Sequence, residues 1–566
     1  MIARVWAPIP ERVAVVVNGH PFPMEPAGDG WWTGPELSPG DRYGFLLGDD
    51  PEPRPDPRGR RLPDGVHGLS EATAPRRAEV GGWRGRTLVD RVIYELHIGT
   101  FTPAGTLDSA VARLDHLVDL GVGFVEPLPV NAFNGRWNWG YDGVAWFAVQ
   151  ESYGGPEAYA RFVTACHERG LGVIQDVVYN HLGPSGNHLP RFGPYLRAEG
   201  TNTWGAELDL DEPEVRRYIL DNARMWFEEY GVDGLRLDAV HALRDTSEEH
   251  ILAELSRETD ALSVRLGRPL TLIAESDLND PVMFAPRAEG GHGLTAQWSD
   301  DYHHAVHVAL TGETAGYYAD FADPDALATV STRGFFHAGT YSSFREREHG
   351  VPLGPDTEAW RLVTFAQDHD QIGNRAAGDR LTASLSPRRL TIAAVLAVLS
   401  PSTPMLFMGE EWGATTPWQF FTSHPEPELG RATAEGRIAE FARMGWDPDA
   451  VPDPQDPATF ERSKLDWSEP EREPHRGLLE QYRRLIALRA HEPELHSPRF
   501  GDVRAESRSD GRLCVERGAI RIRINLGDEP WHSGDVEELL FAGSADVSAT
   551  PVTIPPDGVL VSRARR

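Results

Sequence analysis

The sequence predicts an α/β fold: a (β/α)8 TIM barrel with an N-terminal β-sandwich domain and a small C-terminal antiparallel β domain. Over the middle ~400 residues, short apolar runs alternate with helical stretches, which predicts parallel strands joined by right-handed crossovers. The two ends of the 566-residue chain carry short β-type runs instead. Seven or eight strand–helix units fit a closed barrel better than an open sheet. Because the pattern changes at both ends of the chain, we expect domains at 1–85, 86–494 and 495–566.

The N-terminal domain is indicated by closely spaced strand and turn signals. Residues 13–17 are a β-branched run, and Asn18 and Gly19 directly after it are a hairpin-turn signal. Aromatic-rich runs at 31–32 and 43–45 follow at short spacing. Residues 51–63 are dense in Pro, Asp and Arg, which predicts a loop.

The elements of the barrel and of the C-terminal domain are predicted from spacing. Helices are predicted where apolar residues recur at helical spacing up to a glycine, over 110–120, 159–169 and 215–230. Barrel strands are predicted over 92–98, 122–130, 171–176, 232–238, 269–275, 362–367 and 404–408. C-terminal strands are predicted over 512–517, 519–525 and 558–562.

The charge balance restricts the partners. The formal net charge is −31 at pH 7, and so acidic a surface repels phosphate backbones and anionic lipid. We therefore expect no nucleic-acid and no membrane partner, although the same balance also serves solubility alone. Cys166 and Cys514 are too few for a disulfide framework. The sequence opens on no signal-peptide pattern and holds no run long enough to span a bilayer, so we expect a cytoplasmic protein.

Acidic residues follow several of the predicted barrel strands. In such barrels the strand ends form the face that carries the active site. The acids there are Asp238, Glu275 and Asp370, and convergent carboxyl groups suggest glycoside chemistry, in which one acid protonates and another attacks. An acid-rich loop at 368–370 could instead bind a metal, but too few further ligands converge there. We expect no metal and no cofactor.

The two principal acids differ in their predicted surroundings. Arg236 and Asp238 share one strand face, and if that face lines the barrel, the guanidinium keeps Asp238 ionised, as a nucleophile requires. A purely structural ion pair explains this pattern equally well. Glu275 ends an apolar strand, and burial would raise its pKa as suits a general acid. Taken alone, Glu275 is more simply a helix cap or a surface acid.

Four segments together resemble the α-amylase family of glycoside hydrolases. They occur in the family's order within the strand–helix alternation, at 176–181 (DVVYNH), 234–238 (GLRLD), 274–276 (AES) and 367–370 (QDHD). The resemblance covers about residues 90–490, and the N-terminal domain is similar to the module that precedes the barrel in branching and debranching members. It implies a retaining mechanism with Asp238 as the nucleophile, Glu275 as the general acid/base and Asp370 as the acid that stabilises the distorted sugar.

The resemblance also implies the residues around that sugar. Arg236, His181 and His369 would complete the pocket, and Tyr141 would stack on the ring. Asp368 departs from the Asn that many members have at this place. The segment after His181 is short where calcium-binding members insert a small domain, so the resemblance implies no calcium site.

Further stretches narrow the resemblance to members that hydrolyse the α-1,4 bond next to a terminal trehalose unit of a malto-oligosaccharide. These stretches are residues 94–101, 138–143, 297–304, 367–380, 408–413 and 420–424. Such an enzyme would act after a partner enzyme that forms the trehalose end. The nearest alternative is a glycogen branching transferase, which has the same acids and a similar N-terminal module. A barrel that only binds carbohydrate is the third, and the complete set of acids argues against it.

Wall residues are predicted just beyond the acids. A trehalose unit is compact and bent, so its pocket must reject a straight continuation of the chain. His241, Asn374 and Arg375 offer the donors and acceptors for such a wall. The alternative is that these three side chains only brace the loops.

Two aromatic groups have competing interpretations. His303, His304 and His307 could form a zinc site, but no zinc-protease motif accompanies them, and packing or a substrate hydrogen bond is favoured. Trp137 and Trp139 lie in a loop rich in Gly and Asn, which favours sugar binding, although tryptophan is more often a core residue.

Overall fold

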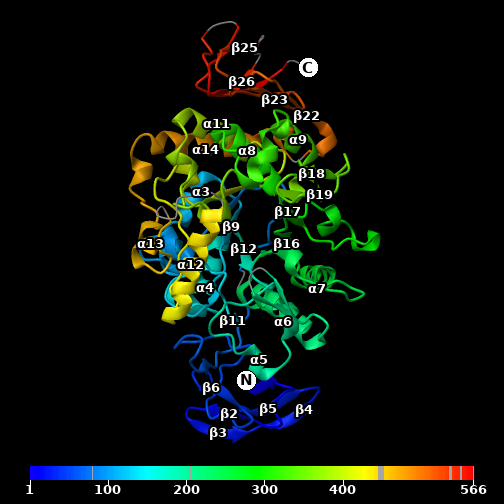
Figure 1. Ribbon diagram of the computed structural model, residues 1–566, viewed down its shortest axis with the longest axis vertical. Helices are drawn as coiled ribbons and strands as arrows, with labels where there is room; N and C mark the ends of the chain where they lie inside the picture. The colour runs from blue at the N-terminus through cyan, green and yellow to red at the C-terminus, as the bar shows by residue number, and fades with distance from the viewer. Residues whose placement is uncertain are drawn as a thin grey trace.

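The computed structural model describes residues 1–78, 81–202, 205–443, 451–496, 498–533, 538–548 and 551–564. Figure 1 shows three parts along the long axis, with the N-terminal strands at one end, the barrel and its helices in the middle, and the C-terminal strands at the other end. The predicted α/β barrel with antiparallel sheets at both ends is confirmed. The domain boundaries at 85 and 494 stay predictions.

Two antiparallel sheets form the N-terminal part. Their strand orders are β1–β5–β4 and β3–β2–β6–β7. The strands are β1 (Ile2–Trp6), β2 (Val13–Val17), β3 (His20–Pro23), β4 (Glu25–Gly28), β5 (Trp31–Glu36), β6 (Arg42–Leu47) and β7 (Ser70–Glu71). Asn18 and Gly19, at φ 50° and 84°, form the predicted turn between β2 and β3, since this two-residue hairpin turn needs two positive φ angles.

The predicted loop at 51–63 joins the N-terminal sheets to the barrel through ion pairs. The Arg58 guanidinium lies 2.8 Å from the Asp221 carboxylate, and that of Arg60 lies 2.7 Å from Glu229. Both acids lie on the helical segment that precedes a barrel strand, so this loop braces two parts of the molecule against each other.

Eight parallel strands close the central barrel, in the order β12–β15–β16–β17–β20–β21–β8–β9. They are β8 (Ile93–Leu96), β9 (Phe124–Pro127), β12 (Gly172–Val177), β15 (Gly234–Leu237), β16 (Thr271–Ala274), β17 (Ala296–Trp298), β20 (Leu362–Thr364) and β21 (Thr403–Phe407). Seven of them overlap predicted strands. The exception is β17, because its three residues are too few to show a periodic pattern in the sequence.

Helices surround the barrel. They are α1 (Ile98–Phe101), α2 (Leu107–Val111), α3 (Leu114–Leu120), α4 (Gly155–Glu168), α5 (Leu189–Phe192), α6 (Pro213–Met225), α7 (Ile251–Leu266), α8 (Asp300–Thr311), α9 (Ala326–Arg333), α10 (His369–Gly373), α11 (Pro387–Val398), α12 (Pro427–Arg443), α13 (Pro457–Arg462) and α14 (His475–His491). The prediction of one continuous helix over 110–120 was wrong, because the helix is interrupted between the end of α2 at Val111 and the start of α3 at Leu114. The helix predicted over 215–230 is α6 followed by a π-helical turn, Trp226–Tyr230, and it ends at Gly231 with φ 79° as expected.

The barrel interior has an apolar layer and a polar layer. The apolar layer is formed by Ile93, Phe124, Ile174, Ile273, Ala296, Val363, Phe365 and Met405. Alternate strand residues share a face, so the interior positions two residues further along β8, β9 and β12 are Glu95, Glu126 and Asp176. The polar layer therefore lies toward the C-terminal ends of the strands, where Arg236 joins it from β15.

Three two-stranded hairpins project from the barrel loops. They are β10 (Asn131–Ala132) with β11 (Ala145–Val149), β13 (Leu196–Asn202) with β14 (Gly205–Leu208), and β18 (Thr340–Ser342) with β19 (Arg347–His349). The segment after His181, expected to be short, thus carries α5 and the β13–β14 hairpin.

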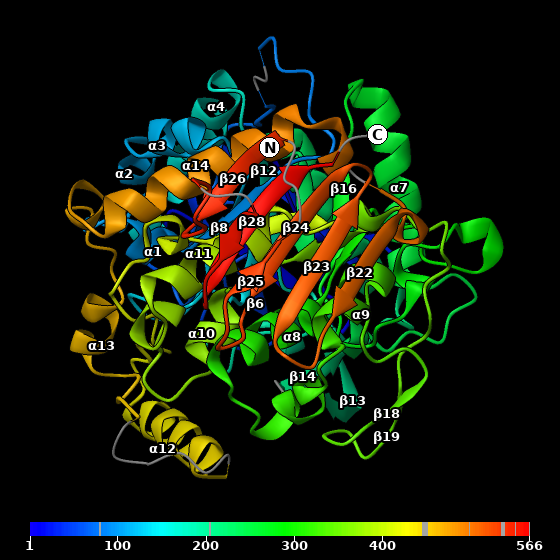
Figure 2. The same cartoon turned by 90° about the horizontal axis from the view of Figure 1, so that it is seen from above.

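The C-terminal part is a five-stranded antiparallel sheet in the order β22–β23–β24–β28–β26, with a two-stranded sheet beside it. The strands are β22 (Val503–Ser507), β23 (Arg512–Arg517), β24 (Ile520–Asn525), β25 (Trp531–His532), β26 (Glu538–Gly543), β27 (Thr553–Ile554) and β28 (Gly558–Arg563), and β23, β24 and β28 confirm the predictions. Figure 2 shows this sheet lying over α9 and α11. Buried Arg517 donates to the Leu399 and Ser400 carbonyls and so anchors the sheet.

No helix within the described ranges is long and apolar enough to cross a membrane. Cys166 is buried and Cys514 is half-buried, and neither forms a disulfide.

Candidate active site

The barrel's hydrogen-bond ladder brings two of the predicted acids side by side. The Asp238 amide donates to the Val177 carbonyl at 3.1 Å, and the Glu275 amide donates to the Leu237 carbonyl at 3.0 Å. Asp238 and Glu275 thus follow directly on the neighbouring strands β15 and β16. Because both strands end at the same rim, Asp238 and Glu275 occupy adjacent positions on that rim.

Arg236 is the centre of this group. It is fully buried, and its Nη1 donates to Asp238 Oδ1 at 2.6 Å and to both oxygens of Asp176 at 3.1 Å. Its Nη2 lies 3.7 Å from Glu275 Oε2, and the guanidinium lies 4.5 Å from the centre of the Trp298 ring. One cation therefore touches both principal acids.

The surroundings of Asp238 favour its ionised form. Burial opposes ionisation, but the charges of Arg236 and His181 and a 2.7 Å hydrogen bond from Asn180 Nδ2 outweigh it, so the pKa of Asp238 is lowered. His181 Nε2 lies 2.9 Å from the Tyr141 carbonyl oxygen, which fixes the imidazole beside the acid. The carboxylate is held as an anion in a fixed orientation.

Glu275 shows the opposite behaviour. Burial raises its pKa to about 8, against the charge of Arg236, and Asp238, Asp300 and Asp370 add to the rise. Its Oε2 accepts a 2.6 Å hydrogen bond from the Ala239 amide. Ala239 has φ 40°, which is strained for a residue with a Cβ, so the chain bends sharply directly after Asp238 to make this contact.

A chain of hydrogen bonds in the polar layer of the barrel links Glu95 to Asp176. Glu95 accepts from both His369 Nδ1, at 2.7 Å, and the His369 amide, at 3.0 Å. His369 Nε2 lies 2.8 Å from the Tyr141 hydroxyl, which donates to Asp176 at 2.7 Å. Burial lowers the pKa of His369, but Glu95 and Asp370 raise it to about 10, so the imidazolium donates from both nitrogens. The rings of Tyr141 and His369 stack at 5.2 Å and 15°.

Asp370 lies at the open side of the group. Its side chain is 45% exposed, the largest exposure among the three acids, and it is therefore the one most accessible to a ligand. Asn374 Nδ2 donates to it at 3.1 Å. Asp368, the departure from the family pattern, caps α10 by accepting from the Gln371 amide at 2.6 Å.

The three predicted wall residues have different surroundings. His241 Nδ1 lies 3.8 Å from Asp277 Oδ1, two positions beyond Glu275. Asn374 accepts from Arg437 Nη2 at 2.7 Å, in addition to its contact with Asp370. Both residues therefore border the acid group.

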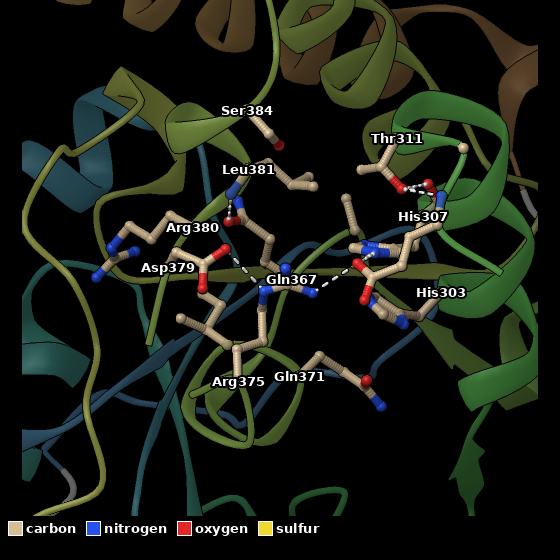
Figure 3. Close-up of a pocket in the computed structure, with 14 residues that line it drawn as sticks. His303, His307, Thr311, Gln367, Gln371, Arg375, Asp379, Arg380, Leu381 and Ser384 are labelled. Atoms are coloured by element: carbon tan, nitrogen blue, oxygen red, sulfur yellow. Dashed lines mark hydrogen bonds and ion pairs between the residues drawn. The ribbon is translucent and has the colours of Figure 1, made fainter. Parts of the chain in front are cut away.

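Arg375 borders a different cavity. Its guanidinium lies 2.9 Å from Glu313 and 2.9 Å from Asp379, and Figure 3 shows Arg375 and Asp379 among the residues that line this cavity. The cavity of about 270 Å³ that it lines includes His303 and His307 but none of the three predicted acids. The geometry favours the bracing alternative for Arg375.

The aromatic residues are mostly packed. Trp139 is 5% exposed, stacks on Trp418 at 5.3 Å and donates to the Gln419 carbonyl, so its surroundings are those of a core residue. Trp137 is half-buried and stacks on Phe460 at 5.3 Å.

The three histidines of α8 pack together. His303, His304 and His307 are all buried, and the His307 ring stacks on Tyr318 at 4.4 Å. Within the described ranges, no cluster of three or more His, Cys, Asp or Glu side chains could hold a metal ion.

Sequence reasoning missed three acids of this site. Glu95 lies inside an apolar run, and Asp176 was seen only as a strand end. Strand parity marks both, since each lies two positions beyond an interior apolar residue. Asp300 follows β17, which was not predicted, and lies in the shared stretch 297–304; its position in the barrel order identifies it as a residue of the barrel mouth.

The chain is similar to known carbohydrate enzymes. Residues 72–190 match the α-amylase family in its catalytic domain. The chain is 61% identical to the malto-oligosyltrehalose trehalohydrolase of Arthrobacter ramosus, over 93% of each chain, and 41% identical to that of Saccharolobus solfataricus, over 82% and 81%. Identity to a 1,4-alpha-glucan branching enzyme of Corynebacterium glutamicum is 28%, over 58% of this chain and 45% of that one.

Two solved structures are also similar to this chain. A crystal structure of an α-amylase candidate from Salmonella typhimurium matches with a TM-score of 0.92 at 36% identity, over 100% of this chain and 97% of that one. A pullulanase from Paenibacillus barengoltzii matches with a TM-score of 0.72 at 20% identity, over 100% and 93%, which is a likeness of fold.

Proposed function

The chain belongs to the malto-oligosyltrehalose trehalohydrolases of the α-amylase family, and on that premise we propose that it hydrolyses the α-1,4-glucosidic bond next to the terminal trehalose of malto-oligosyltrehalose, with retention, and releases trehalose. The observation that carries this proposal is the Arg236 guanidinium, which contacts Asp238 at 2.6 Å and Glu275 at 3.7 Å. Two carboxyl groups that share one cation suit a retaining site, where the two lie only ~5–5.5 Å apart.

In the first step we assign attack to Asp238. Its ionised oxygen bonds to the anomeric carbon of the sugar next to the trehalose unit, while the bond from that carbon to the leaving oxygen breaks. Glu275 gives its proton to the leaving oxygen, so trehalose departs with a neutral hydroxyl. The lowered pKa of Asp238 and the raised pKa of Glu275 support this division of roles.

In the second step the covalent sugar is released. Glu275, now a carboxylate, takes a proton from water, and the water oxygen attacks the anomeric carbon. The bond to Asp238 breaks, and the nucleophile recovers its charge. The exposed carboxylate of Asp370, and Asp176 with Tyr141 beneath it, face the positive charge that develops on the sugar ring.

The branching transferase is the less favoured candidate. It would use the same acids, but its similarity to this chain is partial in both identity and coverage. Hydrolysis and transfer differ in whether water or a sugar hydroxyl takes the glucan chain from Asp238.

We further propose that the enzyme works in the cytoplasm after malto-oligosyltrehalose synthase. The substrate must already carry an α,α-1,1-linked end, so an enzyme that forms that bond has to act first. The charge of −31 is compatible with neutral oligosaccharides and unfavourable for anionic partners.

Product analysis tests the function. Malto-oligosyltrehalose, maltodextrin of equal length and amylose are incubated separately with the enzyme, and the products are separated by chromatography. We expect free trehalose and a shortened malto-oligosaccharide from the first substrate, much slower cleavage of the second, and no α-1,6 branches on the third. Branches on amylose without any release of trehalose would assign the chain to the transferases.

A further inference from the structure

Asp300 is a fourth acid at the mouth of the barrel. It is the first residue of α8 and follows β17, which lies between β16 and β20 in the barrel order. Glu275 directly follows β16, and Asp370 lies in the segment after β20. The barrel order therefore places Asp300 between the strands that position the general acid and the third acid.

Asp300 differs from its neighbour Asp301 in the hydrogen bonding of its side chain. Asp301 Oδ2 accepts hydrogen bonds from Asn279 Nδ2 at 2.8 Å, from the Phe336 amide at 2.8 Å and from the His337 amide at 2.9 Å. The Asp300 side chain is half-buried and forms no hydrogen bond or ion pair with any residue in the described part of the chain. A half-buried carboxyl group without a partner costs free energy, and folds retain such groups mainly where a ligand completes them.

Its electrostatic surroundings are unfavourable for a residue with only a structural role. A carboxylate in the first turn of a helix is stabilised by the helix dipole. Burial, however, raises the pKa of Asp300 to about 7, and the charges of Asp277, Asp370 and Asp301 add to the rise against Arg345 alone. An acid placed only for the dipole would be better exposed, away from other acids.

The same surroundings limit the ligand. Three acids around Asp300 repel anions, and the Asp277 carboxylate is already paired with Arg345 at 3.0 Å, so it is not open to a metal ion. A carboxylate accepts hydrogen bonds and donates none, so it suits hydroxyl groups. Neutral polyhydroxyl compounds, that is sugars, fit this position.

We propose that Asp300 is a specificity-determining residue that accepts hydrogen bonds from hydroxyls of the leaving trehalose unit. This inference rests on the proposed function. Asp300 follows the strand next to the one that Glu275 follows, and its charge interacts with those of Glu275, Asp277 and Arg345, so we assign Asp300 to the side of the general acid, where the leaving group departs. His241, beside Asp277, borders the same side.

The test compares two substrates of equal length, malto-oligosyltrehalose and maltodextrin, with wild type, Asp300→Asn and Asp300→Ala. A hydrogen bond to a charged group corresponds to a change of roughly 10- to 100-fold, so we expect kcat/KM on malto-oligosyltrehalose to fall by about that factor in Asp300→Ala, mainly through KM. We expect kcat/KM on maltodextrin to change less than about threefold, which is the size expected for the loss of a weak hydrogen bond between neutral groups. The ratio of kcat/KM between malto-oligosyltrehalose and maltodextrin should therefore fall in Asp300→Ala.

Binding gives a second readout that does not depend on turnover. Trehalose is titrated calorimetrically into Asp238→Asn, with and without Asp300→Ala, and we expect the second change to weaken trehalose binding by a similar factor. Asp325→Asn is the matched control, since Asp325 is exposed at the start of α9 and its side chain caps nothing. Unchanged trehalose binding, or equal losses on both substrates, would overturn the proposal, as would an effect of calcium on wild type that is absent in Asp300→Ala. Failure of the proposed function is distinguishable from failure of this inference, because wild-type enzyme would then release no trehalose from malto-oligosyltrehalose.

Discussion

Arg236 sets the two principal acids apart. Its Nη1 forms a 2.6 Å hydrogen bond with Asp238, whereas its Nη2 stays 3.7 Å from Glu275, so the same cation holds one acid ionised and leaves the other protonated. Asn180 adds a further hydrogen bond on the Asp238 side. Two carboxyl groups of the same chemistry thereby acquire different pKa values, which suit the different tasks that we propose for them.

Substitution of the two acids should separate these tasks. Asp238→Asn should lower turnover by at least about 1,000-fold, because an amide cannot form the covalent glycosyl intermediate. Glu275→Gln should be as poor on malto-oligosyltrehalose, yet recover much of the rate on a malto-oligosyl fluoride, whose leaving group needs no proton. Steady-state rates on both substrates check this. Equal losses for Glu275→Gln on the two substrates would contradict the role of Glu275 as general acid.

The pH profile should show the raised pKa of Glu275. The first step needs protonated Glu275, so kcat/KM should fall as the pH rises above about 8, where the group loses its proton. Glu275→Gln on the fluoride substrate has no such proton to lose and should show no fall in this range. An alkaline fall that persists in Glu275→Gln would assign the titration to another group.

At the scale of elements, short segments explain both the success and the gaps of the sequence analysis. The helices α4 and α6 and seven barrel strands were predicted, because burial imposes periods of 3.6 and 2 on them, whereas long helices such as α7 and α14 were not. The three-residue strand β17 was not, so the sequence analysis did not recognise Asp300 as a residue of the barrel mouth. Arg375 does follow Asp370 closely in the chain, as the wall prediction used. The direction of its side chain, however, depends on Glu313, sixty-two positions away, and no local sequence pattern shows that contact.

Arg375 tests whether ion pairs brace the loop that follows Asp370. Arg375→Ala removes the pairs with Glu313 and Asp379, which should cost about 1–3 kcal/mol because the group is partly buried. We expect a lower midpoint of thermal unfolding and an unchanged ratio of kcat/KM between malto-oligosyltrehalose and maltodextrin. A large fall in that ratio at unchanged thermal stability would instead make Arg375 a wall residue.

At the scale of the whole molecule, the barrel concentrates buried acids in one layer. Glu126 lies in this layer beside Glu95 and Asp176, and neither of its carboxyl oxygens has a hydrogen-bond partner among the described residues. The family resemblance implied roles for Asp238, Glu275 and Asp370, which lie in short shared segments. It implied no role for the acids of this layer, although Glu95 and Asp176 lie in shared segments too, because the layer depends on which strands become neighbours in the closed barrel.

Glu126 should lower stability at high pH. Burial raises its pKa well above the ordinary 4.5, and Glu95 and Asp176 add to the rise. Below that ordinary value the group is protonated in both states and has no effect. As the pH rises, the unfolded chain loses the proton first, so the free energy of unfolding falls by about 1.4 kcal/mol per pH unit.

Glu126→Gln removes this titration with little change of shape. Its advantage over wild type in denaturant unfolding should be absent near pH 4.5 and should increase steadily toward pH 8. A difference between the two proteins that does not depend on pH would mean that Glu126 keeps its ordinary pKa in the fold.

The central claim is that Asp238 and Glu275 act as a retaining pair on the bond next to trehalose. Proton NMR of a fresh reaction on malto-oligosyltrehalose tests it most directly, because one spectrum reports both the released trehalose and the configuration of the new reducing end. We predict trehalose together with the α-anomer of the shortened chain, before mutarotation adds the β-anomer. A β-anomer that appears first would contradict the assignment of Asp238 as nucleophile, and α-anomer without trehalose would contradict the proposed cleavage site.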